Sequence, residues 1–189
     1  MKKMTRIAVA LLFGACLATP LAAQEAAKPP KPPKPASSAS DALLGAWNYE
    51  GGKLVAMAED FPADKYDFKP NPAQRSFAEQ LLHVAGGNYG FTNAALGKKS
   101  AEEDFKRDQY KTKAEIVAVL KRSIEDGAAA IKAKGDTGLS SEVMCPWDNR
   151  LMRLSEVAYA YVVHAGEHYG QLVVYYRVNN MVPPDSRPH

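Results

Sequence analysis

Apolar residues recur every three to four positions along most of the chain, which is the spacing of an amphipathic helix. The pattern predicts four such helices. The first begins near Asp41, the second covers about 76–96, the third starts at Thr112, and the fourth covers about 153–179. The first helix has one apolar face, made of Leu44, Trp47, Gly51, Leu54, Val55 and Ala58. No segment of useful length alternates between apolar and polar residues, so no sheet is expected.

Residues that start and stop helices support these boundaries. Ser76 and Glu79, and likewise Thr112 and Glu115, have the spacing of a capping box, in which each side chain accepts a hydrogen bond from the other residue's backbone N–H. Gly135 is expected to end the third helix, because glycine adopts the left-handed conformation of a helix C-terminus at little steric cost.

Four helices without a sheet predict an all-α fold, a four-helix bundle. The expected connections, at roughly 12–20 residues, are longer than tight antiparallel helix pairs need. Two alternatives follow for these connections. They could cross the bundle to join parallel neighbours, or they could wall a pocket at one end.

The N-terminus has a different composition from the helical segments. Lys2, Lys3 and Arg6 precede an apolar run over 7–17, and small residues follow as far as Ala23. This order is typical of a secretory signal peptide. The apolar run is shorter than the roughly 20 residues of a membrane-spanning helix. We therefore expect a signal peptide over 1–23 and a secreted, periplasmic protein. A lipoprotein signal with Cys16 as the lipidated residue is the alternative.

The segment after the signal is rich in proline and lysine. Residues 24–40 are expected to form a flexible, solvated linker without a core of its own. The folded domain is then expected over 41–189. Only Cys145 remains after cleavage, so no intrachain disulfide is expected, and a buried, unreactive thiol is the expectation for this residue.

Charge narrows the classes of partner. The chain has 24 Lys and Arg against 21 Asp and Glu, which gives a formal net charge of +3. Lys2, Lys3 and Arg6 account for this excess, so the chain without its signal is close to neutral. Nucleic acid and acidic membrane surfaces are therefore not expected as partners. The expected partner is a small molecule.

Two histidines are the main candidates for chemistry. His164 and His168 are four residues apart in the fourth helix, so both imidazoles lie on one helix face. Two rings at this spacing can share one metal ion. Their face also carries apolar and aromatic residues and a glutamine, namely Val157, Tyr161, Gln171 and Tyr175. If the second and fourth helices are antiparallel, His83 lies at a similar height, and three imidazoles could converge.

Other interpretations of the histidines remain. A histidine on an apolar helix face is often a core residue with a satisfied hydrogen bond. The stretch "HAGEH" also matches the H-x-x-E-H motif of inverted zincin proteases, in which Glu167 would be the general base. That motif needs a downstream glutamate as its third ligand, and no glutamate follows His168. Glu167 is better interpreted as a solvated carboxylate or one hydrogen-bonded to a metal ligand.

Two segments resemble a known family. "SFAEQLLHVAGGNYGFTNAALG" and "HAGEHYGQLVVYYRVNNMVPPDSR" are similar to sequences of the DinB family, also called DinB/YfiT-like proteins, and the likeness covers about 43–187. The resemblance implies a four-helix bundle of up-down-down-up topology. It also implies one divalent metal ion, zinc or nickel, bound by three histidines. By residue match the ligands are His83, His164 and His168.

The resemblance also suggests kinds of activity. Family members include thiol-dependent S-transferases and a thiol-dependent isomerase, which use the metal to activate a low-molecular-weight thiol. We expect a metal-dependent transferase or hydrolase that acts on a small molecule, with Glu167 and Tyr169 as candidate proton carriers. The alternative is a non-catalytic metal-binding or stress-related module. Relatives often dimerise, so a homodimer is a further expectation.

Overall fold

The computed structural model describes residues 36–98, 105–148 and 150–188. The predicted signal peptide with Cys16, most of the predicted linker and His189 lie outside the described residues. Helix α1 begins at Ala39, and Ser38 caps it by accepting a hydrogen bond from the Asp41 N–H (3.1 Å). The last residues of the segment predicted as linker therefore belong to the helical domain.

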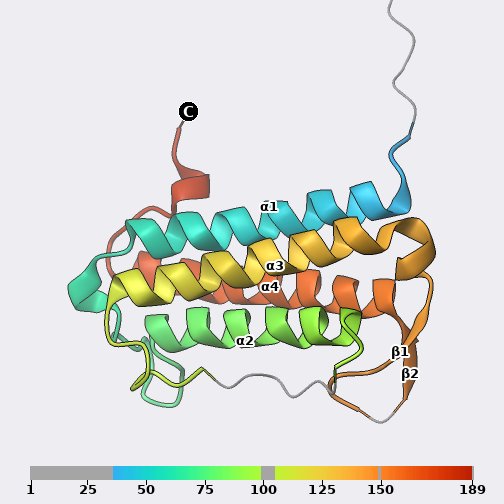
Figure 1. The fold of residues 1–189 in the computed structure, drawn as a ribbon. Coiled ribbons are helices and arrows are strands. Elements are labelled where there is room, and N and C mark those ends of the chain that lie inside the picture. The colour runs from blue at the N-terminus through green and yellow to red at the C-terminus, as the bar shows by residue number, and fades with distance from the viewer. Residues whose placement is uncertain (1–35, 99–104, 149, 189) are drawn as a thin grey trace, which may run out of the picture. The chain divides into compact units, whose positions relative to one another are not determined.

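Four long helices form most of this domain (Figure 1). They are α1 (Ala39–Asp60), α2 (Phe77–Ala95), α3 (Lys113–Leu139) and α4 (Leu154–Val178). Two single-turn 3-10 helices, η1 (Ala63–Lys65) and η2 (Pro184–Ser186), lie in the segments after α1 and α4. The structure thus confirms the predicted number, order and approximate bounds of the helices.

The helices pack as a bundle of up-down-down-up topology, as expected. The colour gradient of Figure 1 shows that α1 and α4 point one way along the bundle and that α2 and α3 point the other way. Helix α1 packs against α3 and α4, and α2 packs against the same two helices. The connection between the parallel helices α2 and α3 must therefore travel the length of the bundle, which explains its length.

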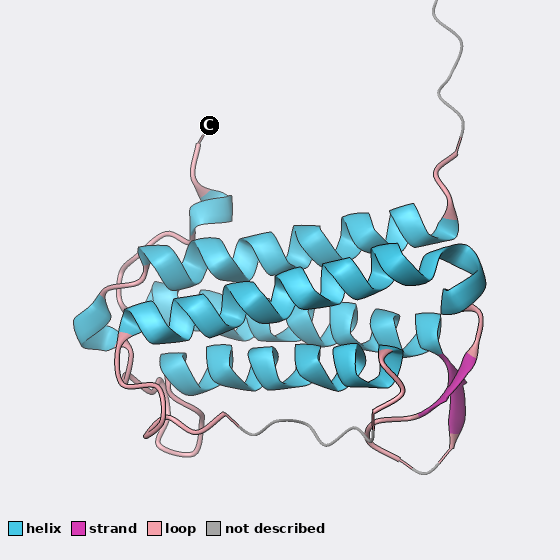
Figure 2. Ribbon diagram, in the orientation of Figure 1, coloured by secondary structure: helices cyan, strands magenta, loops and turns pink. Residues whose placement is uncertain are grey.

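A short β-hairpin corrects the prediction that the chain contains no sheet. Strands β1 (Glu142–Met144) and β2 (Leu151–Arg153) pair antiparallel at one end of the bundle (Figure 2). Each strand has only three residues, too few for an alternating pattern to be recognised in the sequence. Gly135 interrupts the regular geometry of α3 as predicted, but the element continues beyond it. Gly135 has a φ of 55°, which bends the helix, and the chain then makes one more helical turn as far as Leu139.

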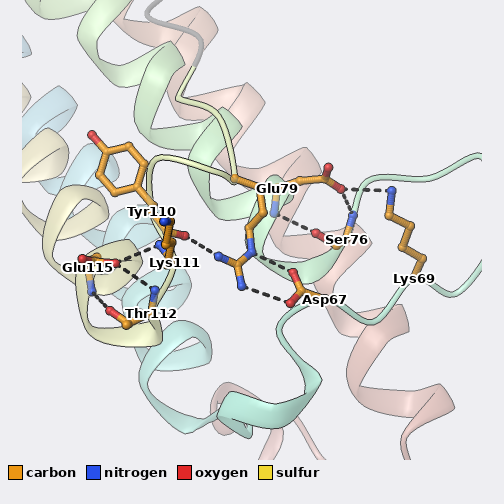
Figure 3. A network of polar contacts seen from close by, with 9 residues as sticks. Asp67, Lys69, Ser76, Glu79, Tyr110, Lys111, Thr112 and Glu115 are labelled. Carbon is orange, nitrogen blue, oxygen red and sulfur yellow. Dashed lines mark hydrogen bonds and ion pairs between the residues drawn. The ribbon is translucent and has the colours of Figure 1, made fainter.

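Polar contacts fix the connections at the other end of α2 and α3 (Figure 3). Both predicted capping boxes are present, at Ser76–Glu79 and at Thr112–Glu115. The Arg107 guanidinium donates to both carboxylate oxygens of Asp67, at 2.7 and 3.0 Å. This bidentate pair joins the α1–α2 connection to the α2–α3 connection, so both loops are held where the two helices begin.

The apolar interior has two clusters along the bundle. One contains Phe61, Phe77 and Tyr176, and the other contains Trp47 and Phe91. On α4 the two clusters meet at His164, one of the predicted metal ligands. Within the described residues, no helix has the length and apolarity that crossing a membrane requires.

Candidate metal centre

Three imidazoles from two helices meet between α2 and α4. The Nε2 atom of His164 lies 3.1 Å from Nε2 of His83 and 3.0 Å from Nε2 of His168. The ring nitrogens that could serve as ligands all lie within 4.8 Å of one another. His168 is buried, whereas His83 and His164 are half-buried. The convergence predicted from an antiparallel α2–α4 pair is thus confirmed.

This geometry fits one divalent metal ion. With metal–nitrogen bonds of about 2.0–2.1 Å, two imidazole nitrogens on one ion lie about 2.9 Å apart at a right angle and about 3.4 Å apart at the tetrahedral angle. The two short nitrogen–nitrogen distances, 3.0 and 3.1 Å, fall within that range. Imidazole nitrogen is a ligand that suits zinc and nickel. The three histidines therefore have the chemistry and the spacing of a metal-binding set.

Gln80 orients one of the three rings. Its Oε1 atom accepts a hydrogen bond of 2.6 Å from Nδ1–H of His168. Its Nε2 atom donates to Gln171 Oε1 (2.7 Å) and to the Tyr175 hydroxyl (3.3 Å), so the orientation of the amide is defined. With the proton on Nδ1, the Nε2 lone pair of His168 points at the other two histidines. Gln80 thus supplies the outer hydrogen bond that metal-binding histidines generally make.

Two glycines of α2 make room for the aromatic side chains of α4. A Cβ atom at Gly87 would lie 3.1 Å from Cε1 of both His164 and Tyr161, and one at Gly90 would lie 2.3 Å from the Tyr161 hydroxyl oxygen. Any larger residue at these positions would therefore move one of the two rings. The glycines allow the His164 and Tyr161 rings to lie side by side against α2.

The electrostatic environment keeps two of the imidazoles neutral. Burial, together with the nearby His83 and Arg75 side chains, lowers the pKa of His164 to about 4. Burial and the neighbouring His164, His83 and Arg75 side chains lower the pKa of His168 to about 3. A neutral imidazole keeps the lone pair that a metal needs, so both residues are ready to bind an ion at neutral pH.

These pKa values predict a pH dependence of stability in the metal-free protein. In the unfolded chain both histidines titrate near pH 6.5, so between pH 6.5 and 4 the unfolded state binds more protons. The free energy of unfolding should therefore fall with decreasing pH, by up to about 1.4 kcal/mol per pH unit for each histidine. Urea unfolding at several pH values measures this slope. A His168→Gln variant should have a smaller slope, and an equal slope in both proteins would contradict the assignment.

Replacing Gln80 by leucine is expected to weaken metal binding about 10- to 100-fold, the usual cost of losing an outer hydrogen-bond partner of a ligand. The Gln80→Leu variant loses the acceptor for Nδ1–H of His168, whereas Gln80→Glu retains one. Competition with a chelating dye measures the affinity of each variant. Equal losses in both variants would show that the hydrogen bond to His168 does not matter.

The two candidate proton carriers lie in different surroundings. Glu167 is exposed on α4. The Tyr169 hydroxyl lies 3.5 Å from Asp185 Oδ2, and the Lys53 ammonium lies 4.2 Å from the centre of its ring. These contacts orient Tyr169 toward α1 and the C-terminal segment. Catalytic roles for the two residues stay predictions.

Sequence inspection did not identify Gln80, Gly87 or Gly90 as part of the site. One signal was available for Gln80, because it precedes His83 by three residues and therefore lies on the same helix face. The glycines carry no such signal, because their importance depends on which α4 side chains face them. Cys145 is buried, as expected.

Comparisons with known proteins agree with the four-helix fold. The sequence profile of the DinB superfamily matches residues 47–172. A DinB-like protein from Bacillus cereus superposes with a TM-score of 0.62 at 16% identity, over 76% of this chain and 95% of its own. YfiT from Bacillus subtilis, described as a probable metal-dependent hydrolase with an unusual four-helix bundle topology, superposes with a TM-score of 0.61 at 14% identity, over 80% of this chain and 94% of its own. A comparison with curated proteins found no match.

Proposed function

The chain belongs to the DinB superfamily, and on that premise we propose that it is a metal-dependent hydrolase of small molecules. One divalent ion, zinc or nickel, would be held by His83, His164 and His168. The observation that carries the proposal is the convergence of three imidazole nitrogens within 4.8 Å. The fold likeness to YfiT, which is described as a probable metal-dependent hydrolase, supports the same reaction class.

The number of ligands favours catalysis over a purely structural role. Structural zinc sites have four protein ligands, whereas catalytic sites have three and leave a position open. Among the described residues, the group contains three histidines and no further cysteine, aspartate or glutamate. His83 and His164 are half-buried and lie closer to solvent than His168, so the proposal needs a small molecule to reach the centre from their side. An open position on that side is what a hydrolase requires.

The chain's own residues would prepare the site. A bound ion would act as a Lewis acid on the substrate and would make water a better nucleophile near neutral pH. Gln80 holds His168 in the orientation and protonation state that a ligand needs. Gly87 leaves room for the His164 and Tyr161 rings against α2, and Gly90 leaves room for the Tyr161 hydroxyl. Glu167, as an exposed carboxylate one residue before His168, is our candidate for moving a proton to the leaving group.

Hydrolysis of small esters and amides by metal-loaded and metal-free protein tests the proposal. We expect turnover with bound zinc or nickel, loss of turnover after chelation, and recovery when the ion is restored. A Glu167→Gln variant should retain its metal and hydrolyse more slowly. Turnover that does not depend on metal would contradict the proposal. Products that contain an added thiol would instead assign the site to the transferase class.

Cobalt substitution separates a catalytic site from a non-catalytic metal-binding module. If a coordination position is open, a small anion such as azide should change the visible spectrum of the cobalt protein, because it enters the set of ligands. A spectrum that does not respond to azide, with its intensity typical of four protein ligands, would favour the non-catalytic module.

A further inference from the structure

Trp147 is an exposed aromatic residue on the turn between β1 and β2. Its side chain is 45% exposed, and its ring stands edge-on to that of Tyr161, with centroids 5.7 Å apart and an interplanar angle of 82°. The turn is closed by a hydrogen bond from the Cys145 N–H to the Arg150 carbonyl (2.9 Å). The hairpin therefore holds the indole in a defined place while much of the ring remains in contact with water.

Tyr161 connects this indole to the histidines. Tyr161 is only 4% exposed, and its ring stands edge-on to His164, with centroids 6.0 Å apart. Gly87 and Gly90 leave the space that the tyrosine occupies. Three aromatic rings thus follow one another from the hairpin to the candidate metal centre. The place of the Tyr161 ring depends on these two helical glycines, because a Cβ atom at either one would clash with it.

The charges on the turn also favour an apolar ligand. Asp148 and Arg150 follow Trp147 on the hairpin, and they pair with each other at 2.7 Å. Their charges therefore offset one another beside the indole. Flat apolar groups gain most from the indole surface, because stacking on it removes apolar area of both partners from water.

We propose that Trp147, supported by Tyr161, is an aromatic subsite next to the three histidines. The substrate would then carry an aromatic ring a short distance from the bond that is hydrolysed. This inference rests on the proposed function, because it places the reacting bond at the metal centre. Trp147 acts as a specificity-determining residue: it binds the ring of the substrate and takes no part in bond breaking.

Hydroxamates provide the test. The hydroxamate group chelates a divalent ion, and the rest of the molecule can then contact the side chains around the metal centre. The zinc-loaded full chain is titrated with acetohydroxamate and with phenylalkyl hydroxamates that have zero to three methylene groups before the ring. Calorimetry gives each dissociation constant. We expect at least one phenylalkyl hydroxamate to bind about tenfold more tightly than acetohydroxamate, a preference in the range that aromatic contact and apolar burial supply.

Variants show whether Trp147 is the source of that preference. In Trp147→Ala the phenyl compounds should lose most of their advantage, while the affinity for acetohydroxamate stays the same. Trp147→Phe should retain part of the advantage. Leu151→Ala is the matched control, because Leu151 is an exposed apolar residue (60%) on the same hairpin, and it should behave like the wild type. Metal content, measured on every variant, should not change.

The outcomes separate the subsite from the hydrolase proposal. If acetohydroxamate does not bind the metal-loaded protein, the centre has no open position and the proposed function fails. If acetohydroxamate binds and no phenyl compound binds more tightly, the aromatic subsite is refuted. The subsite is also refuted if the preference persists in Trp147→Ala, or if Leu151→Ala loses it to the same extent.

Discussion

Replacing His164 by alanine is expected to abolish stoichiometric metal binding. His164 is the central member of the group, because its Nε2 atom is within 3.1 Å of the corresponding atoms of both other histidines. Removing a ligand should cost more than the 10- to 100-fold loss that follows removal of an outer hydrogen-bond partner, so we expect a loss of more than about 100-fold in affinity. Mass-spectrometric metal analysis of the dialysed protein measures the stoichiometry.

A neighbouring substitution separates the loss of a ligand from general damage to α4. Glu167→Gln changes an exposed residue between the two ligands of this helix, and it should bind one ion like the wild type. His83→Ala, on the other helix, should behave like His164→Ala. If both alanine variants retain one tightly bound ion, the histidines are packing residues and the metal centre does not exist.

Replacing Gly127 by alanine is expected to destabilise the protein by about 2 kcal/mol, because overpacking outweighs the gain in helix propensity. A Cβ atom at this position would lie 2.1 Å from Cζ2 of Trp47. The indole cannot easily move, because its Nε1–H donates to the Ile124 carbonyl (2.9 Å) and its ring packs on Phe91 with centroids 5.1 Å apart. The substitution should therefore push α1 and α3 apart, which urea unfolding detects as a lower midpoint.

Gly52→Ala is the matched control for this clash. Gly52 is exposed in the middle of α1, and a Cβ atom there would have no heavy-atom neighbour within 4 Å apart from its own helix. Alanine should stabilise the protein at this position by up to about 1 kcal/mol, the difference in helix propensity. If both variants shift the midpoint in the same direction, the close approach of α3 to Trp47 is not what limits position 127.

The helices were predictable because their signals are local. The apolar spacing and the capping residues of α2 and α3 can be recognised within a few positions of sequence. Tertiary packing then favoured the same helices. The β-hairpin was missed because strands of three residues carry no periodicity. Gly135 did terminate regular helix geometry, but its positive φ produced a bend before one more turn. The sequence alone cannot distinguish a helix end from a kink here, because both use the positive φ that glycine adopts at little steric cost.

The cluster of three histidines was predictable for a different reason. Two histidines at helical spacing are a local pattern, and the third followed from the antiparallel pairing of two helices. The residues around the histidines could not be predicted, because their roles depend on partners far away in the sequence. Gln80 matters through His168, and Gly87 through His164 and Tyr161. Trp147 becomes a candidate subsite residue only because the hairpin, which was not predicted, places its ring next to that of Tyr161.

The most direct test of the metal centre is a crystal structure of the protein loaded with zinc or nickel, with anomalous diffraction recorded at the absorption edge of the metal. We predict one strong anomalous peak between α2 and α4, bonded to Nε2 of His83, His164 and His168, with Nδ1–H of His168 still donating to Gln80. A loaded crystal without a peak at the three histidines, or with the only ion bound elsewhere, would contradict the central claim.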